Sequence, residues 1–186
     1  MTCLALNICM NDCDFVALDF ETANNDRFSA CQLAMIAVKA NKVCETFNHY
    51  IRPPDTFFGF THVHGISYED VKTKSTFSEL YPHIQDFIGG TEHLIAHNMP
   101  FDRGVFTSCC DYYGLTIPEK QWCCTVQIGR QTWPKPAVVN DHKLNTLCRY
   151  FSIDLNHHEA LSDTNAVVEL VIQAQRDGWE PPWLNS

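Results

Sequence analysis

The sequence predicts an α/β fold in which helices flank a mixed sheet. Three segments with the two-residue alternation of strands come first along the chain, and two short apolar strands then alternate with helices. Strands joined by a tight turn pair antiparallel, whereas strands joined through a helix pair parallel. The predicted order of elements, βββαβαβααα, therefore places both kinds of pairing in one sheet.

The strands are assigned from alternation and from their boundaries. In the first strand, Leu18 and Phe20 lie on one face and Asp19 and Glu21 on the other. A hairpin turn is expected at residues 40–42. The expected strands are Phe15–Glu21, Leu33–Lys39, Val43–Ile51, His93–His97 and Trp122–Thr125.

The helices are assigned from caps and from apolar spacing. A capping box, Thr76-Phe-Ser-Glu79, starts the first helix, and Gly89-Gly90 ends it. The expected helices cover residues 76–88, 101–113, 125–130, 144–151 and 160–176. The irregular stretch of residues 51–75 is too long for an inert connection, so it is a candidate for function.

The composition narrows the class of protein. The 186 residues are 45% hydrophobic, and this length fits one globular domain. The 22 Asp and Glu residues exceed the 13 Lys and Arg residues, which gives a formal net charge of −9. This charge argues against a protein that coats nucleic acid or an anionic membrane through its overall field. It is compatible with a protein that binds a phosphodiester locally through metal ions.

Ten cysteines are the other unusual feature of the composition. No Cys-x-x-Cys pair is present, and the adjacent pairs at 109/110 and 123/124 lack the spacing of zinc ligands. The first ten residues have no basic region typical of a secretion signal. We therefore expect buried thiols in a reducing, cytoplasmic location. No apolar run approaches the roughly 20 residues that span a bilayer, so no membrane contact is expected.

Asp19 and Glu21 are the first candidates for chemistry. They lie two residues apart on a strand and project from the same face, about 7 Å apart along the strand. Two acids so placed repel each other unless a cation lies between them, and hard divalent cations such as Mg²⁺ bind carboxylate oxygens. The competing interpretation is a pair of acids on a solvated sheet face. The apolar opposite face and the mid-strand position of Asp19 favour the functional interpretation.

Two further segments deliver acids at helix starts. Leu94–Asp102 leads from a buried strand directly into a helix, so Asp102 lies in the first helical turn. The alternative here is an ordinary N-terminal acid that the helix dipole favours. Near the start of the last helix, His158 lies five residues before Asp163, and the alternative here is a capping acid beside a surface histidine. Four carboxylates and one imidazole from strand ends and helix starts are able to form one site.

Together, three motifs resemble those of the DEDDh, or DnaQ-like, 3′–5′ exonucleases. The motifs are Asp-Phe-Glu-Thr (19–22), Ala-His-Asn-Met-Pro-Phe-Asp (96–102) and His-Glu-Ala-Leu-Ser-Asp (158–163). Glu159 occupies the position where the DEDDy branch has Tyr. The family includes the proofreading epsilon subunit of bacterial DNA polymerase III and stand-alone bacterial relatives. The resemblance implies a ribonuclease H-like three-layer fold with a mixed five-stranded sheet flanked by helices.

The resemblance also implies roles for the acids and for one histidine. Asp19, Glu21, Asp102 and Asp163 would be catalytic residues that bind two divalent cations, Mg²⁺ or Mn²⁺. His158 would be the general base, because an imidazole that titrates near neutrality is suited to accept a proton from water. His157 is one residue off the spacing and is interpreted as a neighbour that flanks the helix.

Substrate contacts are expected from residues next to these motifs, and each has a structural alternative. Thr22 is expected near the terminal nucleotide, or it is an ordinary strand residue. The pair His64 and Ile66 is expected to line a nucleotide pocket, or to flank a structural turn. Further candidates, for which buried hydrogen bonding or core packing is the alternative, are Phe20, His97, Asn98, Phe101 and Trp133.

The function that the resemblance implies is metal-dependent 3′–5′ exonuclease activity in DNA repair or proofreading. DNA is favoured over RNA as the source of the 3′ end, which is expected to be single-stranded, and nucleoside 5′-monophosphates are the expected products. Since the net charge is acidic, local groups such as Lys135 and Lys143 are expected to hold phosphates together with the metals.

Two alternative functions were weighed. A catalytically silent nucleic-acid-binding or interaction module on the same fold is the first, and the intact set of five catalytic residues counts against it. A zinc nucleobase deaminase, suggested by His157-x-Glu159, lacks the Pro-Cys-x-x-Cys ligands. The expected organisation is an N-terminal extension at 1–14, an exonuclease domain at 15–178 and a short C-terminal tail at 179–186.

Overall fold

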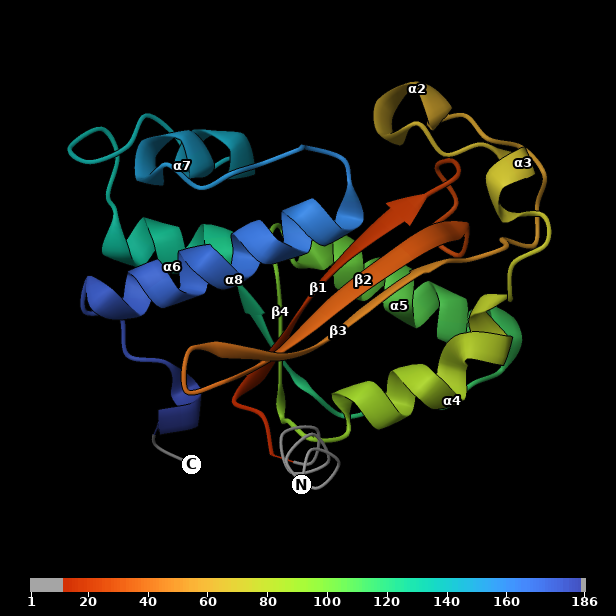
Figure 1. Ribbon diagram of the computed structural model, residues 1–186, viewed down its shortest axis with the longest axis horizontal. Coiled ribbons are helices and arrows are strands. Elements are labelled where there is room, and N and C mark those ends of the chain that lie inside the picture. Colours follow the sequence, from red (N-terminus) through yellow and green to blue (C-terminus); the bar gives the residue numbers. More distant parts are fainter. Residues whose placement is uncertain (1–11, 185–186) are drawn as a thin grey trace, which may run out of the picture.

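A mixed sheet with the strand order β3-β2-β1-β4-β5 forms the middle layer of the computed structural model, which describes residues 12–184 (Figure 1). The strands are β1 (Phe15–Thr22), β2 (Ala30–Lys39), β3 (Lys42–Tyr50), β4 (His93–Ala96) and β5 (Gln121–Cys124). Antiparallel pairing joins β1 to β2 and β2 to β3, while β1 pairs parallel with β4 and β4 with β5. The expected mixed five-stranded sheet is confirmed.

The β2–β3 connection is the expected hairpin. Ala40 and Asn41 both have positive φ, 49° and 61°, which is the geometry of a two-residue turn that matches the twist of its strands. β2 begins earlier than the sequence predicts, at Ala30, because residues 30–32 pair with the end of β1. The register shifts between Glu21 and Thr22, and such an irregularity re-aims side chains at the end of a strand.

The helices are α2 (Thr61–His64), α3 (Tyr68–Val71), α4 (Phe77–Ile88), α5 (Pro100–Tyr113), α6 (Thr125–Thr132), α7 (Leu144–Phe151) and α8 (Ala160–Arg176), followed by a 3₁₀ helix, η1 (Pro182–Leu184). The five helices expected from apolar spacing are present. Residues 51–75 contain two one-turn helices that the sequence did not predict. Four residues are too few to show a periodic pattern. Gly65, in the left-handed region, ends α2, and a capping box at Ser67 begins α3.

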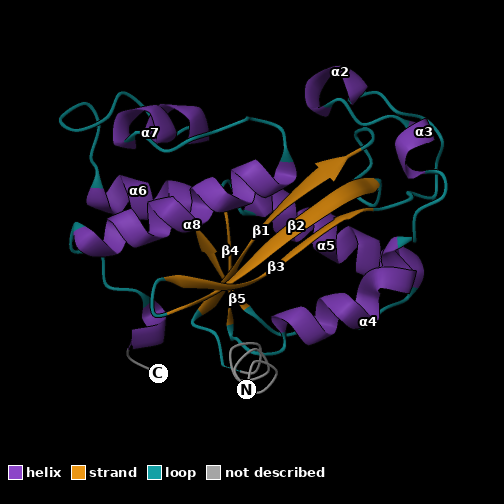
Figure 2. Cartoon of the chain, viewed as in Figure 1, coloured by secondary structure: helices purple, strands orange, loops and turns teal. Residues whose placement is uncertain are grey.

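Helices cover both faces of the sheet, and Figure 2 shows α4 and α5 on one side and α6 and α8 on the other. Leu18 and Phe20 pack with Phe106 in the first core. Ala17 packs with Val167 in the second core. The face of β1 that carries Asp19 is therefore covered by α8, and the interpretation of a solvated sheet face is wrong.

Both ends of the described chain pack against the sheet. The Cys13 N–H donates to the carbonyl of Gly90, and the Trp183 ring lies 4.9 Å from that of Phe15. The expected C-terminal tail thus packs on the second core as far as residue 184. Most of the expected N-terminal extension, residues 1–11, lies outside the described residues. None of the described helices is long and apolar enough to cross a membrane.

Several cysteines fill the core as thiols. Cys13, Cys31, Cys109, Cys110 and Cys148 are buried and free. Burial raises the pKa of Cys13, Cys110 and Cys148 to about 11, so these thiols stay protonated at neutral pH. In residues 12–184, the one group of His, Cys, Asp and Glu side chains close enough together to hold a metal ion is His157, His158 and Asp163, which contains no cysteine.

Replacing Phe106 by Ala is expected to destabilise the protein by about 3–5 kcal/mol. Its ring is 2% exposed and lies edge-on to those of Phe20, Phe77 and Trp122. Chemical denaturation checks the change in the free energy of unfolding. Phe57, which is 65% exposed, is the matched control, and its replacement by Ala should have a much smaller effect. Equal losses for both variants would contradict this account of the core.

Candidate active site

A cavity of about 750 Å³ opens at the C-terminal end of β1. Its floor includes Asp19 and Glu21 of β1, and its other walls come from α2, α6, α7 and the start of α8. The C-terminal ends of β1 and β4 lie together here, because the two strands run parallel in adjacent positions. Ligand sites in open α/β sheets commonly lie at the carboxyl ends of strands, for the same reason.

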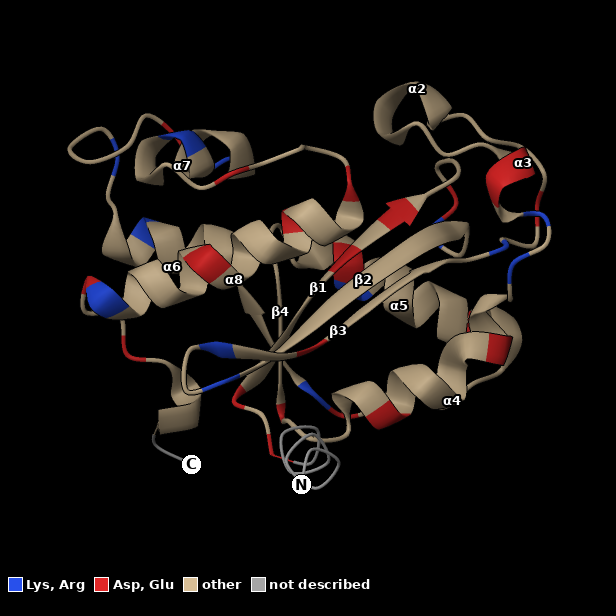
Figure 3. Cartoon of the chain, in the orientation of Figure 1, with Lys and Arg blue, Asp and Glu red and all other residues tan. Residues whose placement is uncertain are grey.

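Four carboxylates converge on this end of the sheet. Asp19 and Glu21 come from β1, Asp102 from the first turn of α5 and Asp163 from the first turn of α8. Figure 3 shows acidic positions on β1 and near the starts of α5 and α8. Asp102 lies just behind the cavity lining, is 1% exposed, and accepts a hydrogen bond from the Phe20 N–H at 3.1 Å. The structure thus brings the four predicted acids together.

Burial and mutual repulsion make this cluster hard to ionise. Burial, then the charges of Asp102 and Asp163, raise the pKa of Asp19 well above its ordinary value. Burial also raises the pKa of Glu21 and of Asp102 to about 8, although the Phe20 N–H opposes the rise at Asp102. The pKa of Asp163 is raised for the same leading reason. At neutral pH, the four groups can therefore all be charged only when cations neutralise them.

The oxygens of Asp163 show where a cation fits. Oδ2 accepts the backbone N–H of His158 at 3.2 Å and lies 2.9 Å from Nδ1 of His157. Oδ1 is buried and has no hydrogen-bond partner among the described residues. A buried carboxylate oxygen without a partner is costly unless something binds it. Oxygen donors of this kind suit hard divalent cations, so the residues present fit the expected metal ions.

Two adjacent histidines border the acids. The rings of His157 and His158 stack, with centroids 3.9 Å apart and planes 19° from parallel, and both line the cavity. Burial and the neighbouring His157 lower the pKa of His158, which favours the neutral imidazole that can accept a proton. The spacing predicts that His157 is a neighbour flanking the helix, yet Nδ1 of its ring lies 2.9 Å from Oδ2 of Asp163. Glu159 caps α8 by accepting the N–H groups of Leu161 and Ser162.

The expected substrate residues divide between the cavity and the core. The Ile66 N–H donates to Nδ1 of His64, so Nε2 carries the proton donated to the Thr22 carbonyl at 3.1 Å. His64 and Thr22 line the cavity. Ile66 is 5% exposed and packs with Ala23 and Cys31, so the structure places it outside the cavity lining, contrary to the expectation of a pocket residue. Phe20 borders the cavity, but its ring is 98% buried in the first core and is not available to stack on a base.

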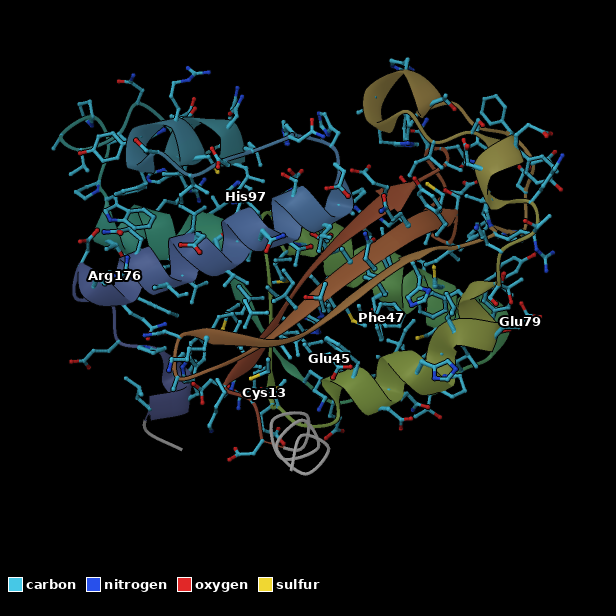
Figure 4. All side chains as sticks on the ribbon, in the orientation of Figure 1. Cys13, Glu45, Phe47, Glu79, His97 and Arg176 are labelled. Atoms are coloured by element: carbon cyan, nitrogen blue, oxygen red, sulfur yellow. The ribbon has the colours of Figure 1, made fainter. Side chains whose placement is uncertain are left out.

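The second motif places three of its side chains at the cavity. Asn98 has a positive φ of 61° and borders the cavity. His97, labelled in Figure 4, lies 2.8 Å from the Thr125 hydroxyl, and burial lowers its pKa to about 4. Phe101 is 37% exposed at the rim, whereas Trp133 is 3% exposed and donates from its indole to Asp177. Trp133 is therefore a core residue and not a stacking platform.

Several residues of the cavity walls are not predicted by the sequence. Phe60 and Val63 form an apolar wall from the irregular segment, and Arg130 and His142 join the expected Lys143 on the opposite wall. No motif marks these residues, because they reach the cavity only through the packing of α2, α6 and α7. Lys135, which is also expected to hold phosphates, is outside the cavity lining.

Comparison with known proteins gives a family match over most of the chain. The family model described as exonuclease matches residues 16–171. A DNA polymerase III PolC-type protein of Halalkalibacterium halodurans is 28% identical over 173 residues, which are 91% of this chain and 12% of that protein. Exodeoxyribonuclease 10 of Escherichia coli is 27% identical over 157 residues, which are 80% of this chain and 63% of that protein.

Solved structures share the fold. Exonuclease X, in complex with 5′ overhanging duplex DNA, has a TM-score of 0.72 at 24% identity, over 89% of this chain and 94% of its own. The nuclease domain of 3′hExo, a DEDDh family member bound to rAMP, has a TM-score of 0.75 at 18% identity, over 88% of this chain and 92% of its own. These structures confirm the ribonuclease H-like arrangement of sheet and helices.

Replacing Asp19 by Asn is expected to raise the melting temperature of the metal-free protein at about pH 8. Glu21 and Asp102 have pKa values of about 8 in the fold, against roughly 4 for unfolded acids. The folded state then holds protons that the unfolded state has released, so the metal-free fold loses stability as pH rises through this window. Removing one carboxylate relieves the repulsion. Melting in EDTA at about pH 5 and about pH 8 checks this.

Added Mg²⁺ or Mn²⁺ should raise the melting temperature of the unaltered protein more at about pH 8 than at about pH 5, since ionised carboxylates bind the cations. Asp154→Asn is the matched control, because Asp154 is an exposed acid away from the cavity. It should leave both effects in place. An Asp19→Asn variant that melts below the unaltered protein in EDTA would sink this account.

Proposed function

Because the chain belongs to the exonuclease family, we propose that it shortens DNA from the 3′ end and releases nucleoside 5′-monophosphates. The family uses divalent metal ions to hydrolyse phosphodiesters. The observation that carries the proposal is the convergence of four carboxylates at one cavity, three in its lining and Asp102 behind it, with an Asp163 oxygen that has no partner in the described structure. The chain spans 12% of the PolC-type relative, so its substrate and its place in a larger system are part of the proposal.

Asp19, Glu21, Asp102 and Asp163 are the residues that would hold two divalent cations, Mg²⁺ or Mn²⁺. When bound, such a pair would lower the pKa of a water so that it can act as the nucleophile, and would supply positive charge that neutralises the phosphate in an in-line displacement. The chain's own contribution begins with geometry. The Phe20 N–H fixes Asp102, and the His158 N–H and the His157 ring fix Asp163, so both carboxylates keep one orientation.

His158 is proposed as the proton acceptor. It lies outside α8 with a φ of +70°, a conformation that residues other than glycine adopt only when their surroundings require it. This turn brings its ring to the cavity beside Asp163. The lowered pKa keeps Nδ1 or Nε2 free of a proton at neutral pH, which is the state that a general base needs.

The two walls of the cavity suit the two halves of a nucleotide. Phe60, Val63 and Phe101 offer apolar surface for bases, while Arg130 and Lys143 offer positive charge for phosphates. A volume of about 750 Å³ is within the range of roughly 300–1,000 Å³ for sites that enclose small ligands. A duplex presents its bases paired, whereas an apolar wall of this kind takes a base only from an unpaired end. We therefore infer a single-stranded 3′ end as the substrate.

DNA is the favoured nucleic acid. The names of the bacterial relatives, a DNA polymerase and an exodeoxyribonuclease, support it. RNA presents the same phosphodiester, and 3′hExo holds rAMP on a similar fold, so RNA cleavage is an outcome that the assay must allow. With DNA as substrate, repair or proofreading in the cytoplasm is the proposed setting.

The purified protein is expected to release 5′-mononucleotides from single-stranded DNA in Mg²⁺ or Mn²⁺, and Asp163→Asn should abolish release. Losing this carboxylate charge weakens metal binding and transition-state stabilisation together. Chromatography of products from linear, 3′-blocked and circular strands, with matched RNA, checks the reaction. Cleavage of the circle would show an endonuclease, and faster release from RNA would move the proposal to RNA. No release from any strand in either metal would favour a silent binding module.

His158→Ala is expected to lower kcat on the order of 10²-fold or more, because a positioned general base contributes about that much. Cation-induced stabilisation should persist in this variant, because the four carboxylates and the backbone N–H of residue 158 that holds Asp163 are unchanged. His157→Ala is the matched variant, since it removes the neighbouring ring and leaves the proposed base. If His157→Ala lost activity while His158→Ala kept it, the assignment of the base would be wrong.

A further inference from the structure

Planar side chains continue from the cavity rim along α5. Phe101 and Tyr112 lie 11 residues apart, which places them on nearly the same line of the helix, about 16 Å apart along its axis. Phe101 is 37% exposed and borders the cavity, and Tyr112 is 52% exposed. Both side chains lie on the side of α5 that faces the loop between β1 and β2, because residues 27 and 28 of that loop contact them.

Arg27 of this loop is fixed against the start of α5. Its Nη1 donates to the carbonyls of Pro100 and Phe101 at 3.2 and 3.0 Å, and its guanidinium lies over the Phe101 ring, 5.6 Å from the centroid. Gly104 leaves the room that this guanidinium occupies, since a Cβ at that position would collide with it. The exposed Arg27 is therefore held flat on the helix and does not extend freely into solvent.

Phe28 extends the row to the far end of the helix. Its ring stacks on that of Tyr112, with centroids 4.7 Å apart and planes 17° from parallel. Phe101 with Arg27, and Phe28 with Tyr112, thus form two pairs of planar groups along one side of α5, and the first pair begins at the cavity. We call these four residues the α5 strip.

We propose that the α5 strip binds the two or three nucleotides of a single strand that precede the terminal one. This inference rests on the proposed function, because the strand must enter the cavity at its 3′ end. Single-stranded nucleic acid binds to rows of aromatic side chains and arginines, since every base has a face that can stack. The strip is continuous with the cavity through Phe101, which belongs to both.

Stacking, and not charge, is the main source of binding at the strip. The exposed acids Asp26 and Asp111 are sequence neighbours of Arg27 and Tyr112, so the single cation of the strip does not create a positive field there. Phosphate contacts are provided instead by Arg130 and Lys143 on the cavity wall. The strip should therefore add affinity that depends on strand length and only weakly on salt.

The test compares a single-stranded DNA of ten nucleotides with a dinucleotide. In Tyr112→Ala, the ratio of kcat/KM for the decamer to that for the dinucleotide is expected to fall on the order of tenfold. Arg27→Lys, which keeps the charge but loses the planar group, should lower the same ratio. Tyr150→Ala is the matched control, since Tyr150 is an equally exposed tyrosine, 53% against 52%, on α7. Its ratio should equal that of the unaltered protein.

Fluorescence anisotropy of a labelled decamer in Ca²⁺ provides a reading that needs no hydrolysis. Weaker decamer binding in Tyr112→Ala than in Tyr150→Ala supports the strip, with circular dichroism showing that both variants are folded. Equal ratios and equal binding in both variants would overturn the proposal. Absence of hydrolysis by the unaltered protein would count against the proposed function, while the binding comparison would still decide the strip.

Discussion

Mutual repulsion among four carboxylates, three of them buried, is the constraint on which the site depends. Asp19 and Glu21 lie on a strand covered on both faces, and Asp102 and Asp163 approach from the starts of α5 and α8. Helix N-termini carry partial positive charge, and backbone N–H groups bond to Asp102 and Asp163, so the fold offsets part of the repulsion. The repulsion that remains among the carboxylates favours the binding of cations. The site is therefore incomplete as a set of ionised groups until metal binds.

The two hydrophobic cores make this concentration of charge possible. Aromatic rings from β1, α4 and α5 hold one face of the sheet, and aliphatic residues of α8 hold the other. Because α5 and α8 are fixed to opposite faces, their first turns meet at the end of β1 without room to move apart. The same placement leaves one side of α5 exposed at the cavity rim. The geometry of the proposed active site and the proposed strand-binding surface are therefore consequences of one packing arrangement.

Much of the fold was predictable because it is encoded locally. Alternating residues gave β1, helical spacing gave α8, and the Thr76 capping box gave the start of α4. The one-turn helices α2 and α3 were missed, since four residues carry no period. Ile66 was misplaced for a related reason. Its neighbour His64 reaches the cavity, but the sequence contains nothing that says which of the two side chains turns inward to the core.

The sequence by itself determined which groups are available for the proposed site, because the types and spacing of Asp19, Glu21, Asp102, His158 and Asp163 predict a carboxylate cluster with an imidazole. Only the tertiary structure decided what surrounds it. The ring of His157 lies on Asp163 although its spacing suggested a bystander, and Arg130 and Phe60 reach the cavity from helices and loops without a motif. Residues two apart on one strand necessarily share a face, whereas the walls and rim of the cavity form where elements distant in sequence pack together.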